Sequence, residues 1–327
     1  MEMTGTSTIR RAGAQALRGW LRYLLASPHQ TAGECEQQVT VFLDYARAMG
    51  LDLSRLWVRE PERGGGVRTG AGAAVLCIPS AGRSAMLVLP DGRVHPPRGD
   101  EWVSLVGRAM ADPTVSDVRL FQALLAEGDE PGRRELERAG FGEIAMLIYM
   151  ERAVGLAAPA ARRLDHAMRW VTYDETVREL FGATILATYE GSLDCPGLAG
   201  LRELDDVLAS HRGAGRFAAH RWLLLLKGEE PAGCILLAEH PLQPVLEIAY
   251  MGVTPRFRGR GLGSQLLAEA FGLAHREQFQ RVTLAADARN APALRMYGRA
   301  GFTEFLRRRA MLHRRVSNSI SQRRYDP

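Results

Sequence analysis

The stretch of sequence that decides the fold runs from residue 246 to residue 263. It reads Leu246-Glu-Ile-Ala-Tyr-Met-Gly-Val253-Thr-Pro-Arg-Phe-Arg258-Gly-Arg-Gly261-Leu-Gly263. An apolar strand ends at Val253, and a turn and a glycine-rich loop lead into residues whose apolar members recur at helical spacing. Glycines let a backbone approach a ligand closely, and free N–H groups at a helix start attract anions. The stretch predicts a strand, an anion-binding loop and an amphipathic helix at about 262–277.

The loop does not have the spacing of the two common phosphate-binding motifs. No Gly-Lys-Ser/Thr follows it, and it lacks the G-x-G-x-x-G order of dinucleotide-binding loops. Arg258 and Arg260 can place positive charge near a diphosphate. Taken alone, the loop is also compatible with a basic turn that is capped by glycine and binds nothing.

A second motif follows the loop and makes the pattern more specific. It reads Asn290-Ala-Pro-Ala293-Leu294-x-x-Tyr297-x-x-x-Gly301-Phe302. Together, the Arg258-x-x-Gly261-x-Gly263 loop and this motif resemble the GNAT acyltransferase superfamily. The resemblance spans roughly residues 163–314. It implies that acetyl-CoA is the co-substrate, that no metal is needed, and that the loop binds the pyrophosphate of coenzyme A.

The resemblance also implies where the cofactor contacts the chain. The family separates its fourth and fifth strands, so the backbone of Met251, Gly252 and Val253 would bind the pantetheine arm. Asn290 would lie near the thiol end. The pyrophosphate would contact Arg258 and the loop backbone, which comprises Gly259, Arg260, Gly261, Leu262, Gly263 and Ser264.

Two residues are candidates for acid–base chemistry on the pattern of the family. Tyr297 would protonate the departing thiolate; the alternative is an aromatic side chain that only packs on the sheet. Glu247 would deprotonate the amine, because burial in an apolar strand raises a carboxylate pKa. The alternative for Glu247 is an edge-strand carboxylate that faces water or pairs with an arginine.

The polar segment from Thr188 to Pro196 corresponds to the region where relatives bind the acceptor. Tyr189, Glu190 and Asp194 are therefore candidate acceptor-binding residues, although the segment is equally compatible with an ordinary turn after a helix. Cys195 is disfavoured as a nucleophile because no histidine is near it in sequence. The three histidines His211, His220 and His240 are expected at the surface or at helix ends.

The chain contains an internal repeat. Pro131–Glu143 aligns with Pro292–Glu304 without a gap and shares Pro, Arg, Ala, Gly, Phe and Glu positions. Both halves have a similar predicted order of helices and strands. We therefore expect an α+β fold of two GNAT-like domains, each a mixed, mostly antiparallel sheet flanked by helices. The expected boundaries are 1–155 for the first domain, 156–163 for the linker, 164–316 for the second domain and 317–327 for a basic, disordered tail.

The first half lacks the features of the loop. At the repeat offset, the positions of Arg258, Gly261 and Gly263 are occupied by Pro97, Asp100 and Trp102. Aspartate repels a diphosphate, tryptophan fills the space that the backbone must approach, and proline lacks an N–H donor. Asn290 and Tyr297 correspond to Asp129 and Leu136. We expect a degenerate domain that packs, shapes the acceptor cleft or forms a homodimer.

Composition indicates a globular protein, with 46% hydrophobic and 24% charged residues and a net charge of +5. The four cysteines show no metal-ligand or disulfide spacing, and no apolar run is long enough to cross a membrane. These features predict a cytoplasmic protein. The arginines from Arg307 onward are expected to form a solvated strand edge followed by the tail, and nucleic-acid binding is disfavoured because no aromatic residues interleave with them.

The sequence as a whole predicts an N-acyltransferase that moves an acetyl group directly from acetyl-CoA to an amine in a ternary complex. A small-molecule acceptor is favoured over a protein. The alternatives are a non-catalytic acyl-CoA sensor or scaffold, and an acetyltransferase for protein lysines or N-termini.

Overall fold

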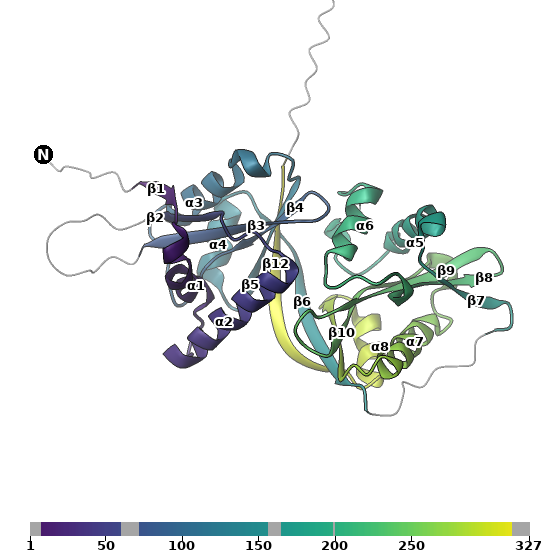
Figure 1. Ribbon diagram of the computed structural model, residues 1–327. Coiled ribbons are helices and arrows are strands. Elements are labelled where there is room, and N and C mark those ends of the chain that lie inside the picture. The colour runs from purple at the N-terminus through teal and green to yellow at the C-terminus, as the bar shows by residue number, and fades with distance from the viewer. Residues whose placement is uncertain (1–7, 60–71, 156–164, 199, 316–327) are drawn as a thin grey trace, which may run out of the picture.

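The structure, a computed structural model, describes residues 8–59, 72–155, 165–198 and 200–315. Its centre is a single sheet of 12 strands (Figure 1). The strands of the first half are β1 (Ile9–Arg11), β2 (Leu56–Arg59), β3 (Ala73–Ser80), β4 (Ser84–Val88), β5 (Leu120–Ala126) and β6 (Gly142–Ala153). Those of the second half are β7 (Met168–Thr172), β8 (Trp222–Lys227), β9 (Glu230–Glu239), β10 (Val245–Val253), β11 (Arg281–Asp287) and β12 (Thr303–Arg314).

Helices cover both faces of the sheet. In the first half, α1 (Leu17–Leu25) and α2 (Ala32–Met49) pack on one face, and α3 (Glu101–Met110) and α4 (Glu130–Arg138) on the other. In the second half, α5 (Arg178–Tyr189) and α6 (Leu204–Arg212) lie opposite α7 (Leu262–Arg276) and α8 (Ala291–Arg299) (Figure 1). The α+β class predicted from the sequence is confirmed.

Burial explains the two kinds of apolar pattern. The continuous run Trp222–Leu226 is buried throughout because β8 is an interior strand with side chains covered on both faces. The helical stripe of α7 is buried as its spacing predicts, with Leu266, Leu267 and Ala270 fully inaccessible to solvent. The glycine-rich loop at 258–263 is thus followed by a helix whose apolar stripe is buried.

The two halves exchange their last strands. In the sheet, β12 lies between β5 and β6, and β6 lies between β12 and β11. Met311 of β12 pairs with Ala123 of β5, whereas Tyr149 of β6 pairs with Ala285 of β11. Each half therefore completes the sheet of the other, which the sequence did not predict.

The predicted division into domains stays a prediction. The linker 156–163 and the tail 317–327 lie outside the described residues, as does most of the glycine-rich segment 64–72. The boundary falls in sequence between β6 and β7, but in space the first half includes β12 and the second half includes β6. The sheet is continuous across that boundary.

The expectation of a solvated strand edge at the arginine-rich end is wrong. β12 is an interior strand, paired on both sides. Its Arg309 is largely buried and forms ion pairs with Glu130 at 2.8 Å and with Glu143 at 3.3 Å. These arginines contribute to the contact between the halves, because the strand exchange places them in the middle of the sheet.

A tight turn of the first half contacts α6. Gly82 has a φ of +76°, and a Cβ atom there would lie 2.2 Å from the carbonyl oxygen of Asp206. The adjacent Arg83 donates hydrogen bonds to both oxygens of the Asp206 carboxylate, at 2.7 Å to Oδ1 and at 2.6 Å to Oδ2. Only glycine permits this close approach, so the β3–β4 turn connects the first half to α6.

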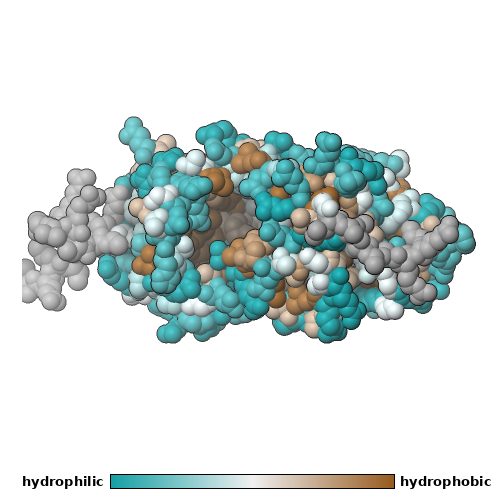
Figure 2. Space-filling view, turned by 90° about the horizontal axis from the view of Figure 1, so that it is seen from below, coloured by the Kyte–Doolittle hydropathy of each residue, from teal (hydrophilic) through white to brown (hydrophobic). Residues whose placement is uncertain are grey.

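A second contact joins the halves near the end of α2. The rings of Tyr45 on α2 and His240, in the loop after β9, lie 5.5 Å apart. From below, Figure 2 shows a hollow near the junction of the halves. Among the described residues, no helix is long and apolar enough to span a membrane.

Candidate functional site

The central feature of the site is the separation of two neighbouring strands. Parallel pairing between β10 and β11 stops at Ile248 and Leu284, although both strands continue beyond it. A bulge interrupts β10 between Ile248 and Tyr250, and the residues from Tyr250 to Val253 pair only with β9. One edge of β10 therefore faces an opening instead of a strand. A cavity of about 670 Å³ lies there, lined by Ala249–Val253 and by residues of the second half's loops and helices.

The loop before α7 presents unpaired donors to this cavity. Gly259 and Gly261 have φ values of +73° and +81°, a region that favours glycine. The N–H groups from Gly259 to Gly263 donate no hydrogen bond to any described residue, and no side chain caps the helix. A Cβ atom at Gly263 would lie 2.6 Å from the sulfur of Met296. The glycines thus leave free N–H donors at a helix start, an arrangement that suits an anion.

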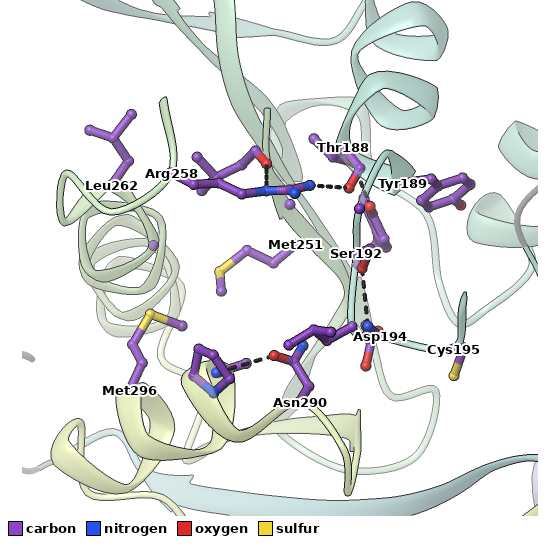
Figure 3. A pocket seen from close by; sticks show the side chains of 18 of the residues that line it. Thr188, Tyr189, Ser192, Asp194, Cys195, Met251, Arg258, Leu262, Asn290 and Met296 are labelled. Carbon is purple, nitrogen blue, oxygen red and sulfur yellow. Dashed lines mark hydrogen bonds between the residues drawn. The ribbon is translucent and has the colours of Figure 1, made fainter. Parts of the chain in front are cut away.

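Arg258 connects the two walls of the cavity. Its guanidinium donates to the carbonyl oxygen of Val253 at 3.1 Å and to that of Thr188, near the end of α5, at 2.9 Å (Figure 3). Its positive charge stays beside the cavity. Arg260 lies elsewhere, with its guanidinium 5.4 Å from the ring centre of Phe257, and does not line the cavity.

Tyr297 and Asn290 line the same cavity from α8. Asn290 begins the helix, and its Oδ1 accepts a hydrogen bond from the N–H of Ala293 (Figure 3). Tyr297 is 7% exposed, and burial, with a smaller contribution from the charge of Asp194, raises its pKa above the ordinary value. The phenol therefore keeps its proton at neutral pH.

Glu247 lies near this cavity but does not line it. It pairs with Ala238 of β9 and Thr283 of β11, on the strand segment before the separation. Its charge acts on Tyr45 of α2 and Tyr149 of β6, both from the first half. Burial raises the pKa of its carboxyl above the usual range. The predicted base thus faces the junction of the halves.

The loop after α5 forms the other wall. Tyr189 and Asp194 line the cavity and Glu190 does not. Burial raises the pKa of Tyr189 to about 12 and that of the Cys195 thiol to about 12, so both groups stay protonated. The rejection of Cys195 as a nucleophile agrees with this protonated thiol.

His211 and Arg202 are among the cavity residues that sequence reasoning missed. His211 does lie in the last turn of α6, as expected for a helix-end residue, but it faces inward and lines the cavity. Burial lowers the pKa of His211 to about 3. Arg202, just before α6, lines the cavity as well. No local spacing signals either residue, because their positions depend on how α6 packs against α5.

The corresponding region of the first half is filled by its own residues. The carboxylate of Asp129, the counterpart of Asn290, accepts hydrogen bonds from the N–H groups of Gly92 and Gly132 at 3.1 and 2.9 Å. Trp102 and Leu136 are buried, and β4 is paired with β5 almost to its end at Val88. The first half thus lacks the strand separation of the second half.

Among the described residues, no three His, Cys, Asp or Glu side chains are arranged to bind a metal ion.

Comparison with known proteins agrees with this geometry. Residues 185–302 match the Acetyltransferase (GNAT) family. The mycothiol acetyltransferase of Clavibacter sepedonicus is 28% identical over 248 residues, which cover 71% of this chain and 73% of that protein.

Solved structures share the fold of the whole chain. A GCN5-related N-acetyltransferase from Sphaerobacter thermophilus has a TM-score of 0.60 at 18% identity, covering 94% of this chain and 95% of the other. A tandem GNAT protein from the clavulanic acid biosynthesis pathway has a TM-score of 0.52 at 15% identity, covering 94% and 98%. Residues 185–302 of this chain thus form a GNAT acetyltransferase domain, and the protein is an N-acetyltransferase.

Proposed function

We propose that the protein transfers an acetyl group from acetyl-CoA directly to the amine of a small molecule. The observation that supports this most strongly is the separation of β10 from β11 beside the unpaired N–H groups that precede α7. GNAT acetyltransferases use acetyl-CoA as co-substrate. An extended arm with an anionic end fits an open strand edge that leads to an anion-binding loop.

The residues that would bind the co-substrate come from three elements. The backbone of Met251, Gly252 and Val253 would bind the pantetheine arm, and Asn290 would lie near the thiol. Gly252 suits this place, because a Cβ atom there would lie 2.6 Å from the side chain of Thr188. The N–H groups from Gly259 to Ser264 would bind the diphosphate, with Arg258 adding positive charge.

Acetyl-CoA supplies a thioester whose carbonyl carbon an amine can attack. Tyr297 would then give its proton to the departing sulfur. Its raised pKa keeps the phenol protonated at neutral pH, so that a donor is present when the thiolate forms. A thiol has an ordinary pKa near ~8.5, below that of the phenol, so the hydroxyl would first stabilise the departing thiolate by a hydrogen bond.

Glu247 would act as the base that removes a proton from the acceptor. An alkyl ammonium with a pKa near ~10.4 must lose a proton before it can attack. The raised pKa of Glu247 brings its basicity closer to that of the amine. Because Glu247 does not line the cavity, we propose that a water molecule relays the proton.

The comparisons favour a small-molecule acceptor. Three relatives are mycothiol acetyltransferases. Tyr189 and Asp194 would border the acceptor, with Asp194 acting mainly through the position of its loop; Glu190 does not line the cavity and is the weaker candidate.

An acetyl-CoA thiol-release assay across a panel of small amines and peptides tests the proposal. We expect turnover with a small amine and strong loss of turnover in Tyr297→Phe. Binding of acetyl-CoA without turnover on any acceptor would instead support a sensor. Turnover restricted to peptides would support a protein acetyltransferase.

A further inference from the structure

Arg202 occupies a position that the proposed mechanism does not use. It lines the cavity of about 670 Å³ and also a second cavity of about 640 Å³ where α6 meets the first half. The remaining residues of the second cavity are Arg119, Leu120, Gly200, Leu201, Glu203, Arg314 and Arg315. Arg202 therefore lies at the boundary between two cavities.

Arg202 forms no ion pair with any described residue, and the adjacent Glu203 is paired with Arg119 at 3.1 Å. Its Nε is buried and has no hydrogen-bond partner. A guanidinium that is partly removed from water and lacks a counter-ion is unfavourable unless a ligand provides one.

In the first cavity, the charge of Arg202 acts on three neutral groups: the Tyr189 hydroxyl, the Cys195 thiol and the His211 ring. Burial raises the pKa of Tyr189 and of Cys195 to about 12 and lowers that of His211 to about 3. Asp194, which lines the same cavity, also acts on Tyr189 and Cys195 but forms no ion pair with Arg202. Arg202 thus lies among hydrogen-bonding groups without an ion-pair partner in the described part of the chain.

His211 adds a second unsatisfied group beside Arg202. Its Nε2 is buried without a hydrogen-bond partner, while its ring packs 5.1 Å from the ring of Tyr250. Buried polar atoms without partners are uncommon in proteins and often mark ligand positions. Two such atoms, on Arg202 and His211, belong to side chains that line one cavity.

This cationic position is separate from the diphosphate loop. The neighbours of Arg202 come from α5, the loop after it and α6, whereas the unpaired N–H groups lie at the start of α7. Figure 3 shows Tyr189 and Cys195 on the side of the cavity opposite Leu262. A ligand whose anionic group binds at the loop before α7 therefore leaves Arg202 without a counter-ion.

We propose that Arg202, assisted by His211, binds an anionic oxygen group of the acceptor, so that the preferred substrate is an amine that also carries a carboxylate or a phosphate. This rests on the proposed acetyl transfer to a small amine. The anionic co-substrate repels an acidic acceptor, and Arg202 offsets that repulsion at the acceptor's end of the cavity. The amine would point toward Tyr297 while its acidic group remains near α6.

Matched acceptors test the proposal directly. We would compare ω-amino acids with alkylamines of the same length, and an aminoalkyl phosphate with its alcohol. The wild type should show a kcat/KM at least about tenfold higher for the acidic member of each pair. Arg202→Gln should abolish this preference mainly through KM, and Arg202→Lys should retain part of it. The pair with the larger ratio of kcat/KM, acidic member over neutral member, identifies whether a carboxylate or a phosphate is the group recognised.

Arg119→Gln is the matched control, because Arg119 lines only the second cavity and lies outside the proposed site. It should keep the wild-type preference, which separates a local contact from a general change in charge. Equal kcat/KM values for both members of every pair would overturn the inference and leave acetyl transfer intact.

A binding measurement tests the inference independently of catalysis. Absence of turnover with every amine would contradict the proposed function, but it would leave the binding result to decide on Arg202. Glutarate and inorganic phosphate serve as probes, and the readout is the shift in melting temperature. A shift in the wild type and in Arg119→Gln that is lost in Arg202→Gln supports the site. No shift in the wild type, or an equal shift in all three proteins, overturns it.

Discussion

The side chains of Asp194 and Asp287 hold the loop after α5 against the end of β11. Asp194 accepts a hydrogen bond at 2.8 Å from the N–H of Asp287, whose carboxylate accepts one at 3.2 Å from the N–H of Cys195. Asp287 is fully buried and also accepts from Arg289. This reciprocal pair positions the wall that carries Asp194 and Cys195, although the two residues lie far apart in sequence.

Asp287→Ala should lower the free energy of unfolding by about 2–3 kcal/mol, because buried backbone and guanidinium donors lose their acceptor. It should also raise KM for the acceptor, since the loop loses its attachment. Urea unfolding and steady-state kinetics measure the two effects. Arg289→Ala is the control: its side chain is 57% exposed, and the loss should be about 1 kcal/mol or less. Equal losses in both variants would contradict the central role of Asp287.

Tyr297→Phe should reduce kcat by about a hundredfold or more while acetyl-CoA binding stays unchanged, because it removes the proton donor and little else. Tyr250→Phe is a matched control from the same cavity. The Tyr250 hydroxyl is 2.5 Å from that of Thr188, so this variant should lose stability, about 1 kcal/mol, but little kcat. A small kcat effect in Tyr297→Phe would contradict the proposed acid role.

The pH dependence of the rate tests Glu247. A base must be deprotonated to act, so kcat/KM should rise with pH through the pKa of Glu247, which burial places above the usual carboxyl range. Glu247→Gln should remove this acidic limb and lower the rate at neutral pH. A variant that keeps the same pH profile would show that another group accepts the proton.

His211 should make stability depend on pH. Its pKa is about 3 in the folded protein and near ~6.5 when unfolded, so the unfolded chain binds the extra proton between these values. Stability is therefore lost as pH falls below about 6.5, by roughly 2 kcal/mol at pH 5. His211→Phe keeps a ring against Tyr250 and should remove that part of the loss in denaturant titrations. Identical pH dependence in the two proteins would contradict the neutral, buried state of His211.

Much of the fold could be predicted because its signals are local. The glycines at 259, 261 and 263 and the apolar stripe after them predict the loop and α7 from a few consecutive residues. Asn290 predicts the start of α8 for the same reason, since its side chain caps the helix that follows. The absence of the loop motif from the first half could be predicted as well, because Asp100 and Trp102 stand at the positions of Gly261 and Gly263.

The strand exchange could not be predicted, because β6 and β12 are the corresponding strands of two repeats. Strand pairing joins residues far apart in sequence, and only the three-dimensional arrangement of the halves decides that β12 pairs with β5. Arg202 and His211 were missed for a related reason. Their place at the cavity depends on the packing of α6, which no residue spacing encodes.

The central claim is that the cavity between β10 and β11 binds acetyl-CoA, and equilibrium binding to Gly261→Asp tests it most directly. Gly228→Asp is the control, because Gly228 also has a left-handed φ, +60°, with open space around it, but lies in the β8–β9 turn. Both variants introduce the same charge and a similar backbone strain. The account predicts that Gly261→Asp weakens acetyl-CoA binding by at least about tenfold, through charge repulsion at the diphosphate, whereas Gly228→Asp binds as the wild type does. Equal affinities in all three proteins would contradict it.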